Sequence, residues 1–231
     1  GYTRPQSEIL PDHLRFIDDA LDYCDLTDSY PDDAKFRWTC EVTWVVREWF
    51  ARRPASQIER FTKRVKEGRI EVTGMFVNMS EIATEASLAA SLQPVRELKD
   101  AGIPIRLAMQ NDVNGAAWCL VDYLQPAGVI YLTMGMNKTR SLLPFDVPTA
   151  FWWESPAGRR MLAFRSEHYQ IANALSIQEG NLDLFHMKLL NYLKGMEDEH
   201  YPYDRFVLQY SGYQVDNSPP AIRESDFVKA W

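Results

Sequence analysis

The sequence predicts an α/β fold in which a parallel sheet is covered by helices on its outside. Segments with apolar residues at helical spacing alternate along the chain with short runs that are typical of strands. Polar side chains follow the ends of most of the predicted strands. Alternating helices and strands are the pattern of parallel sheets, which place their functional groups where the strands end.

The first half of the chain shows this alternation clearly. Its predicted elements are, in order, a helix over 7–23, a strand over 36–40, helices over 43–51 and 55–67, a strand over 69–74 and a helix over 84–101. Pro54 separates the second helix from the third, and Gly68 ends the third. Pro94 predicts a kink or a restart within the last of these helices.

The second half continues the alternation and adds a hairpin. Its predicted elements are, in order, a strand over 105–109, a helix over 116–124, a strand over 129–132, a hairpin of 151–154 with 160–165, a helix over 182–195, a strand over 205–210 and a last helix from 220. The segment 134–150 carries Gly, Asn, Pro and Ser and is predicted to be a loop.

The composition excludes several classes of partner. The 231 residues are 46% hydrophobic, which is enough for a sizeable core in one domain or a domain and a half. A net charge of −7 without a basic block argues against nucleic acid and against an anionic membrane surface. No apolar run is long enough for a transmembrane helix. The three cysteines form no CxxC pair, so they predict neither a zinc knuckle nor a redox site.

Carboxylates, amides and aromatic rings follow the predicted strands, and we expect them to meet at one edge of the sheet. They are Glu41, Phe76, Asn78, Glu81, Gln110, Asn111, Asp112, Asn137, Tyr213, Asp216 and Asn217, and Met134 occupies the same kind of position. Such a set offers both hydrogen-bond donors and acceptors, as a polyhydroxylated ligand requires. The aromatic content of 13% suits a carbohydrate cleft, where rings stack on sugar faces, as well as it suits a core.

Asp112 is the first candidate for a reactive group because a predicted strand ends just before it. The alternative is that Asp112 only caps the next helix, and such caps far outnumber catalytic aspartates. Glu41 can either hold a sugar hydroxyl or cap the helix that starts near Val42. Asn78 can line a cleft with Glu81 or belong to a plain loop.

Four stretches resemble the N-terminal catalytic domain of glycoside hydrolase family 38, the α-mannosidases, and in particular its divergent bacterial members. The start of the chain, 1–6, is similar to the end of the family's His-x-Asp-x-Gly-Tyr-Thr motif and the residues directly after it. The segment 36–41 is similar to the second-strand segment, and 65–74 with 78–81 resembles a later strand and its Asn-containing turn. The segment 109–115 matches the turn that carries the family's nucleophile.

The resemblance implies a seven-stranded β/α barrel of the glycoside hydrolase and deacetylase type, a retaining mechanism and a zinc ion. It implies that Asp112 is the nucleophile and a zinc ligand, and that Asp216 is the acid/base. Because they follow the ends of predicted strands, Glu41, Asn78, Glu81, Asn111 and Asn217 are expected to bind the substrate. The other zinc ligands would lie outside residues 1–231, and so would the first strand, so we expect a partial barrel domain that is inactive as a fragment.

Two alternatives remain beside an α-mannosidase-like hydrolase. One is a non-catalytic carbohydrate-binding domain derived from such a hydrolase. The other is a polysaccharide deacetylase-like enzyme, which would need a His-rich metal motif that the chain does not contain. We expect a carbohydrate partner and a bacterial periplasmic or secreted location rather than a cytoplasmic one, and a homo-oligomer is compatible with the sequence.

Overall fold

The computed structural model describes residues 4–78, 83–113, 115–137, 139, 142–213 and 218–231. Contacts within the chain divide it into two compact units. The helical unit comprises 1–38, 145–148 and 167–231, and the sheet unit comprises 39–144 and 149–166. Among the described residues, no helix combines the length and the apolar character that a bilayer crossing needs.

The helical unit contains helices of very different lengths. They are α1 (Gln6–Leu26), η1 (Asp32–Ala34), α7 (Ile171–Ala174), η3 (Ile177–Glu179), α8 (Leu182–Asp198) and α9 (Arg223–Ala230). One face of α1 is buried, as its apolar spacing predicts. Phe185 and Leu189 of α8 form a buried cluster with Phe227 of α9, and the rings of Phe185 and Phe227 meet edge to face at 4.9 Å.

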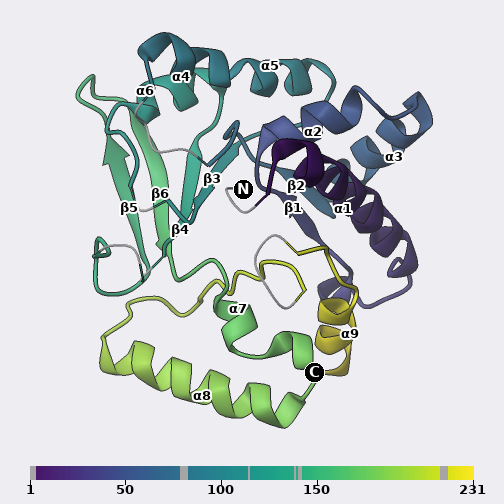
Figure 1. Cartoon of the computed structure of the whole chain (residues 1–231). Helices are drawn as coiled ribbons and strands as arrows, with labels where there is room; N and C mark the ends of the chain where they lie inside the picture. The colour runs from purple at the N-terminus through teal and green to yellow at the C-terminus, as the bar shows by residue number, and fades with distance from the viewer. Residues whose placement is uncertain (1–3, 79–82, 114, 138, 140–141, 214–217) are drawn as a thin grey trace. The chain divides into compact units, whose positions relative to one another are not determined.

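The sheet unit contains two sheets (Figure 1). One pairs β1 (Trp38–Cys40), which begins one residue before this unit, with β2 (Ile70–Val72). The other has the order β3-β4-β6-β5 and consists of β3 (Leu107–Asn111), β4 (Tyr131–Gly135), β6 (Arg160–Ser166) and β5 (Thr149–Glu154). The sheets approach each other where Gly74 N donates a hydrogen bond to Leu107 O at 2.8 Å.

The carboxyl ends of three strands lie level with one another. The strands β3, β4 and β6 are parallel, and Asn111 is in register with Gly135, which is in register with Ser166. The strand β5 is antiparallel to β6, as the predicted hairpin requires. Residues that follow Asn111 and Gly135 therefore leave the sheet from the same edge.

Helices of the sheet unit pack through apolar faces and a few polar contacts. They are α2 (Thr43–Phe50), α3 (Ala55–Lys66), α4 (Glu85–Ser91), α5 (Gln93–Asp100), α6 (Leu120–Leu124) and η2 (Gln125–Ala127). Trp49 of α2 and Phe61 of α3 are both fully buried, with ring centroids 5.3 Å apart. Arg47 of α2 pairs with Glu97 of α5 at 3.0 Å.

The prediction of a seven-stranded β/α barrel is wrong for the described residues, because they form separate sheets of two and four strands and no closed barrel. The larger sheet ends at the antiparallel strand β5, which leaves an open edge. The segment 205–210, expected to be a strand, is irregular. Its Phe206 and Leu208 pack on the α8 cluster, and Gln209 O accepts a hydrogen bond from Ala172 N instead of from a neighbouring strand.

Other predicted elements differ in their ends. The expected helix over 84–101 is two helices, α4 and α5, with the restart just before Pro94. The strand β3 extends two residues beyond Met109. The helix expected from 116 begins only at Leu120, because Trp118 contributes its indole and its carbonyl to bonds with the β5 hairpin.

Candidate functional site

Hydrogen bonds join the polar residues that follow β1 and β2. Glu41 comes directly after β1, and its carboxylate accepts a hydrogen bond from Asn78 Nδ2 at 2.7 Å. The backbone of Glu41 is held as well, since its carbonyl accepts a bond from Thr73 Oγ1. The same Asn78 amide reaches β3, because its Oδ1 accepts from Asn111 N at 3.4 Å. Three chain segments that are distant in sequence are thereby tied together.

Asn111 extends this row from β3 to β4. It is the last residue of β3, and its side chain is 5% exposed. Its Oδ1 accepts a hydrogen bond from Gly135 N at 3.0 Å. Because the amide oxygen is hydrogen-bonded, burying this side chain costs little folding free energy, and a polar residue is tolerated at the end of a core strand.

Asp112 lies next along the chain, at the edge of the sheet, with an unusual backbone conformation. Its φ is 63°, in the left-handed region that aspartate and asparagine tolerate better than most residues. Asp112 N donates to Gly135 O at 3.0 Å, which anchors the turn to β4. The carboxylate is partly exposed, and its Oδ1 accepts a hydrogen bond from Asn137 Nδ2 at 2.5 Å. Strained backbone of this kind is frequent at functional sites.

Asn137 is in turn held by Thr139. Its side chain is buried, and its Oδ1 accepts two hydrogen bonds, from Thr139 N at 3.0 Å and from Thr139 Oγ1 at 2.6 Å. The amide nitrogen is therefore the end that faces Asp112.

Gln110 stabilises the turn through a side-chain hydrogen bond. It is fully buried in β3, and its Nε2 donates to Gly115 O at 2.7 Å, which closes the loop that begins at Asp112. Its Oε1 is buried and has no hydrogen-bond partner among the described residues. Gln110 thus stabilises the loop rather than lining a ligand site.

The resulting site is an acidic edge flanked by amides. Glu41 and Asp112 supply negative oxygens, and Asn78, Asn111 and Asn137 supply neutral amides. Amides and carboxylates together can bind sugar hydroxyls, which both donate and accept. A fixed carboxylate can also attack an electrophilic carbon or stabilise a cationic transition state.

The structure describes only part of the predicted site. It brings Glu41, Asn78 and Asn111 together and places Asp112 beside Asn137. Three predicted site residues, Glu81, Asp216 and Asn217, lie outside the described residues.

A zinc ion needs more ligands than the described residues provide. Protein zinc sites use three or four Cys, His, Asp or Glu side chains. Within the part of the chain that the structure describes, no three such residues cluster in that way. Asp112 alone, already bonded to an amide, does not fit a complete zinc site.

Sequence reasoning missed the role of Thr139 and Thr73, which hold Asn137 and Glu41. The Asn-x-Thr spacing of 137–139 is a local turn pattern that could have indicated the first of these contacts. The contact of Thr73 with Glu41 joins two strands, and no local pattern predicts it.

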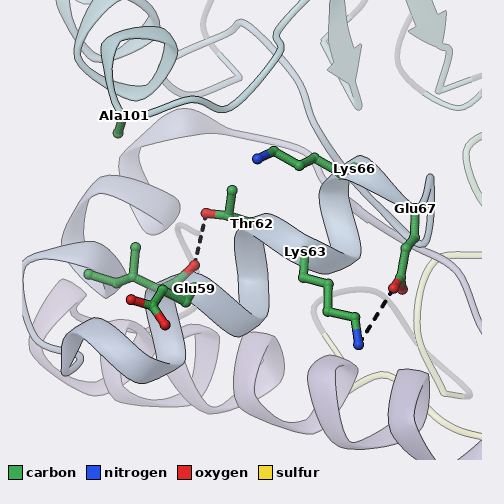
Figure 2. A pocket seen from close by; sticks show the side chains of 7 residues that line it. Glu59, Thr62, Lys63, Lys66, Glu67 and Ala101 are labelled. Carbon is green, nitrogen blue, oxygen red and sulfur yellow. Dashed lines mark hydrogen bonds and ion pairs between the residues drawn. The ribbon is translucent and has the colours of Figure 1, made fainter.

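A separate hollow of about 610 Å³ lies along α3 (Figure 2). It is lined by Ile58, Glu59, Thr62, Lys63, Lys66, Glu67 and Ala101. Lys63 pairs with Glu67 at 3.8 Å, and Thr62 bonds back to the helix carbonyl of Ile58. None of the predicted site residues lines this hollow, and its lining is that of a solvated helix face.

Comparison with known proteins identifies related sequences and folds. The sequence matches the family described as "Glycosyl hydrolases family 38 N-terminal domain" over residues 1–231. None of the curated proteins compared with the chain matches it.

Three solved structures are similar. An α-mannosidase from Enterococcus faecalis V583 is 18% identical with a TM-score of 0.69, over 98% of this chain and 24% of that one. A glycosyl hydrolase family 38 protein from Enterococcus faecalis is 14% identical with a TM-score of 0.60, over 98% and 26%. A 4-alpha-glucanotransferase from Thermococcus litoralis is 10% identical with a TM-score of 0.50, over 91% and 31%. The likeness shows a shared fold, and the chain spans about a quarter of the length of the first two structures.

Proposed function

Because the chain belongs to the N-terminal domain family of the family 38 glycosyl hydrolases, we propose that it carries the nucleophile of a retaining, α-mannosidase-like hydrolase. One observation carries this proposal. The partly exposed carboxylate of Asp112 stands at the end of a parallel strand, oriented by Asn137 and next to a row of amides. Carbohydrate is the substrate class that the family and the polar edge both favour.

The proposed reaction is a double displacement. Asp112 Oδ1 is bonded to Asn137, so Oδ2 is the oxygen that attacks C1 of the sugar. The bond from C1 to the leaving oxygen breaks, and that oxygen takes a proton from an acid, for which Asp216 is our candidate. Water then attacks C1 of the glycosyl ester and gives a proton back to the same acid group, while the bond from C1 to Asp112 Oδ2 breaks and the free carboxylate is restored. Retention requires the two carboxyl groups to be about 5–5.5 Å apart.

The remaining predicted site residues would bind sugar hydroxyls. Glu41 and Asn78 are already bonded to each other, so they can act as one preformed unit. Glu81, Asn111 and Asn217 complete the proposed substrate-binding set. We also propose that zinc is bound by the longer protein, with Asp112 as one ligand and the others outside residues 1–231.

Replacement of Asp112 tests the proposal most directly. In the full-length protein, we expect Asp112→Asn and Asp112→Ala each to lower kcat/KM for aryl α-mannosides by at least about 10³-fold. Azide should partly rescue Asp112→Ala, because it can enter the space of the lost carboxylate. Its nitrogen then bonds to C1 as the aryloxide leaves, which gives a β-mannosyl azide.

The outcomes distinguish the alternatives. Unchanged hydrolysis by Asp112→Asn would show that Asp112 is not the nucleophile. Sugar binding without turnover in the wild type, equally strong in Asp112→Asn, would instead support a non-catalytic carbohydrate-binding domain.

Asp216 calls for a different experiment, because an acid matters most for poor leaving groups. We expect Asp216→Ala to hydrolyse dinitrophenyl α-mannoside at nearly the wild-type glycosylation rate and methyl α-mannoside about 10²-fold or more slowly. Equal losses on both substrates would remove Asp216 from the role of acid.

A further inference from the structure

We propose that Asn137 is a positioning residue, which fixes the rotamer of the Asp112 carboxylate and leaves one chosen oxygen available for attack. The kinetic consequence of this inference rests on the proposed function. The contact itself does not, so the two can be tested separately.

Adjacent parallel strands place these two side chains together. Asn111 at the end of β3 is level with Gly135 at the end of β4, and the Asp112 amide is bonded to the Gly135 carbonyl. Asp112 lies one residue beyond its strand and Asn137 two residues beyond its own. The pairing therefore depends on the register of the core sheet.

The amide of Asn137 can face Asp112 in only one orientation. Thr139 presents a backbone N–H and a hydroxyl to Asn137 Oδ1. If the amide were rotated by 180°, its NH₂ group would face the Thr139 N–H, and two donors would oppose each other. The same rotation would set the amide oxygen against the carboxylate oxygen. Thr139 thus selects the orientation in which Asn137 donates to Asp112.

A donor fixed in this way has a definite effect on the carboxylate. The bond to Oδ1 holds the plane of the carboxyl group, with Oδ2 free of this contact. Asn137 is 7% exposed, so water has little access to replace it. A misplacement of about 1 Å at a reacting group can cost on the order of 10²-fold in rate.

The first test compares pH profiles of variants in the full-length protein. We expect Asn137→Asp to lower kcat/KM about 10–100-fold at pH 7 and to recover part of this loss as the pH falls. Two facing carboxyl groups share one proton more readily in acid, and that proton restores a donor toward Asp112. Asn137→Ala should lose activity without such recovery. Thr139→Val should lose less, because the backbone N–H of residue 139 remains.

A matched control makes the same chemical change elsewhere in the sheet unit. Gln125 Nε2 donates to Arg160 O at 3.2 Å, at the opposite end of the strands. Gln125→Glu should leave the pH profile unchanged. A profile of Asn137→Asp that parallels the wild type at every pH would overturn the proposal.

The second test does not depend on activity. At pH 8 the single variant Asn137→Asp places two charges face to face, and we expect a lower melting temperature. The double variant Asp112→Asn with Asn137→Asp again has one amide and one carboxylate. We expect its melting temperature to recover most of the decrease, while the protein stays inactive. Purely additive melting shifts would show that the side chains do not interact. If the shifts are coupled but Asp112→Asn is active, the proposed function fails and the contact stands as structural.

Discussion

Individual side chains of the polar edge are held by partners that are distant in sequence. Asn78 bonds to Glu41 across 37 residues, and Asp112 bonds to Asn137 across 25. Each contact joins the ends of different strands, so the geometry of the edge depends on the sheet as a whole. We therefore expect a single substitution at this edge to change the orientation of neighbouring side chains more than it changes the stability of the fold.

Glu224 provides a prediction at the same scale, in the helical unit. Burial raises the pKa of its carboxyl from 4.5 to about 7, against the opposing effect of backbone N–H bonds from Glu224 itself and Ala221. Its Oε2 is buried and has no hydrogen-bond partner among the described residues. Because the folded-state pKa is raised, the stability contributed by the protonated form is complete below about pH 4.5 and is lost as the pH rises through 7.

The variant Glu224→Gln stays neutral at every pH. Each pKa unit corresponds to about 1.4 kcal/mol, so we expect the variant to gain on the order of 3 kcal/mol in stability over the wild type between pH 4.5 and pH 8. Melting temperatures of both proteins at several pH values measure this difference. Glu197→Gln, at an exposed position on α8, is the control and should show no such trend. A gap between Glu224→Gln and wild type that is constant with pH would contradict the prediction.

Residue-level reasoning from the sequence succeeded where a side chain follows its own strand. Glu41, Asn78 and Asn111 were expected at one edge, and the structure brings them together. It could not predict which atoms pair, because pairing depends on the register between strands. The orientation of Asn137 toward Asp112 is of this kind, since only the three-dimensional structure shows both sets of its partners.

Elements were predicted best where periodicity is strong and local. The helices α1, α2, α3 and α8 lie where apolar spacing placed them. The strand β3 ends two residues later than expected because Gln110 and Asn111 look like loop residues in sequence, yet both are buried with side-chain hydrogen bonds. The segment 205–210 has a strand-like composition, but its Phe206 and Leu208 pack against the buried cluster that includes Phe185 and Leu189 of α8. Tertiary packing decides such cases.

Two glycines give opposite predictions for the same substitution. Gly74 lies where β2 approaches β3, and a Cβ there would come within 2.9 Å of Val129 Cγ2. Val129 is fully buried and β-branched, so it has little room to move. We expect Gly74→Ala to destabilise the protein by about 1–3 kcal/mol.

Gly195 lies inside α8, and a Cβ there meets nothing within 4 Å. We expect Gly195→Ala to stabilise the protein by about 0.5–1 kcal/mol, because alanine loses less backbone entropy in a helix. Denaturant midpoints of the two variants measure both effects with one chemical change. A stabilising Gly74→Ala would show that β2 and β3 are more loosely packed than the structure indicates.

At the scale of the whole molecule, the expected barrel was wrong while the family was right. Four short stretches of sequence were enough to identify the family, which the match over residues 1–231 confirms. Closure of a sheet depends on which strands pair at its edges, and β5 runs antiparallel there. Local sequence patterns contain little information on that pairing. Local patterns are equally uninformative about a metal site, because its ligands come from distant segments, and no three metal-binding side chains cluster among the described residues.

The proposed zinc gives a prediction for the full-length protein that a matched pair of variants can test. Asp112→Asn and Glu41→Gln each replace one carboxylate of the polar edge by an amide. Only Asp112 is a proposed ligand, and an amide is a much poorer ligand for zinc than a carboxylate. We expect about one zinc per chain in the wild type and in Glu41→Gln, and far less in Asp112→Asn.

Elemental analysis after dialysis measures the metal directly, and chelation should remove zinc and turnover together. Full zinc content in Asp112→Asn would place the metal away from the proposed nucleophile. Turnover that survives complete removal of zinc would show that the reaction does not need it. If Glu41→Gln lost zinc as well, the two carboxylates would belong to one metal site, and Glu41 would no longer be a candidate for binding sugar hydroxyls.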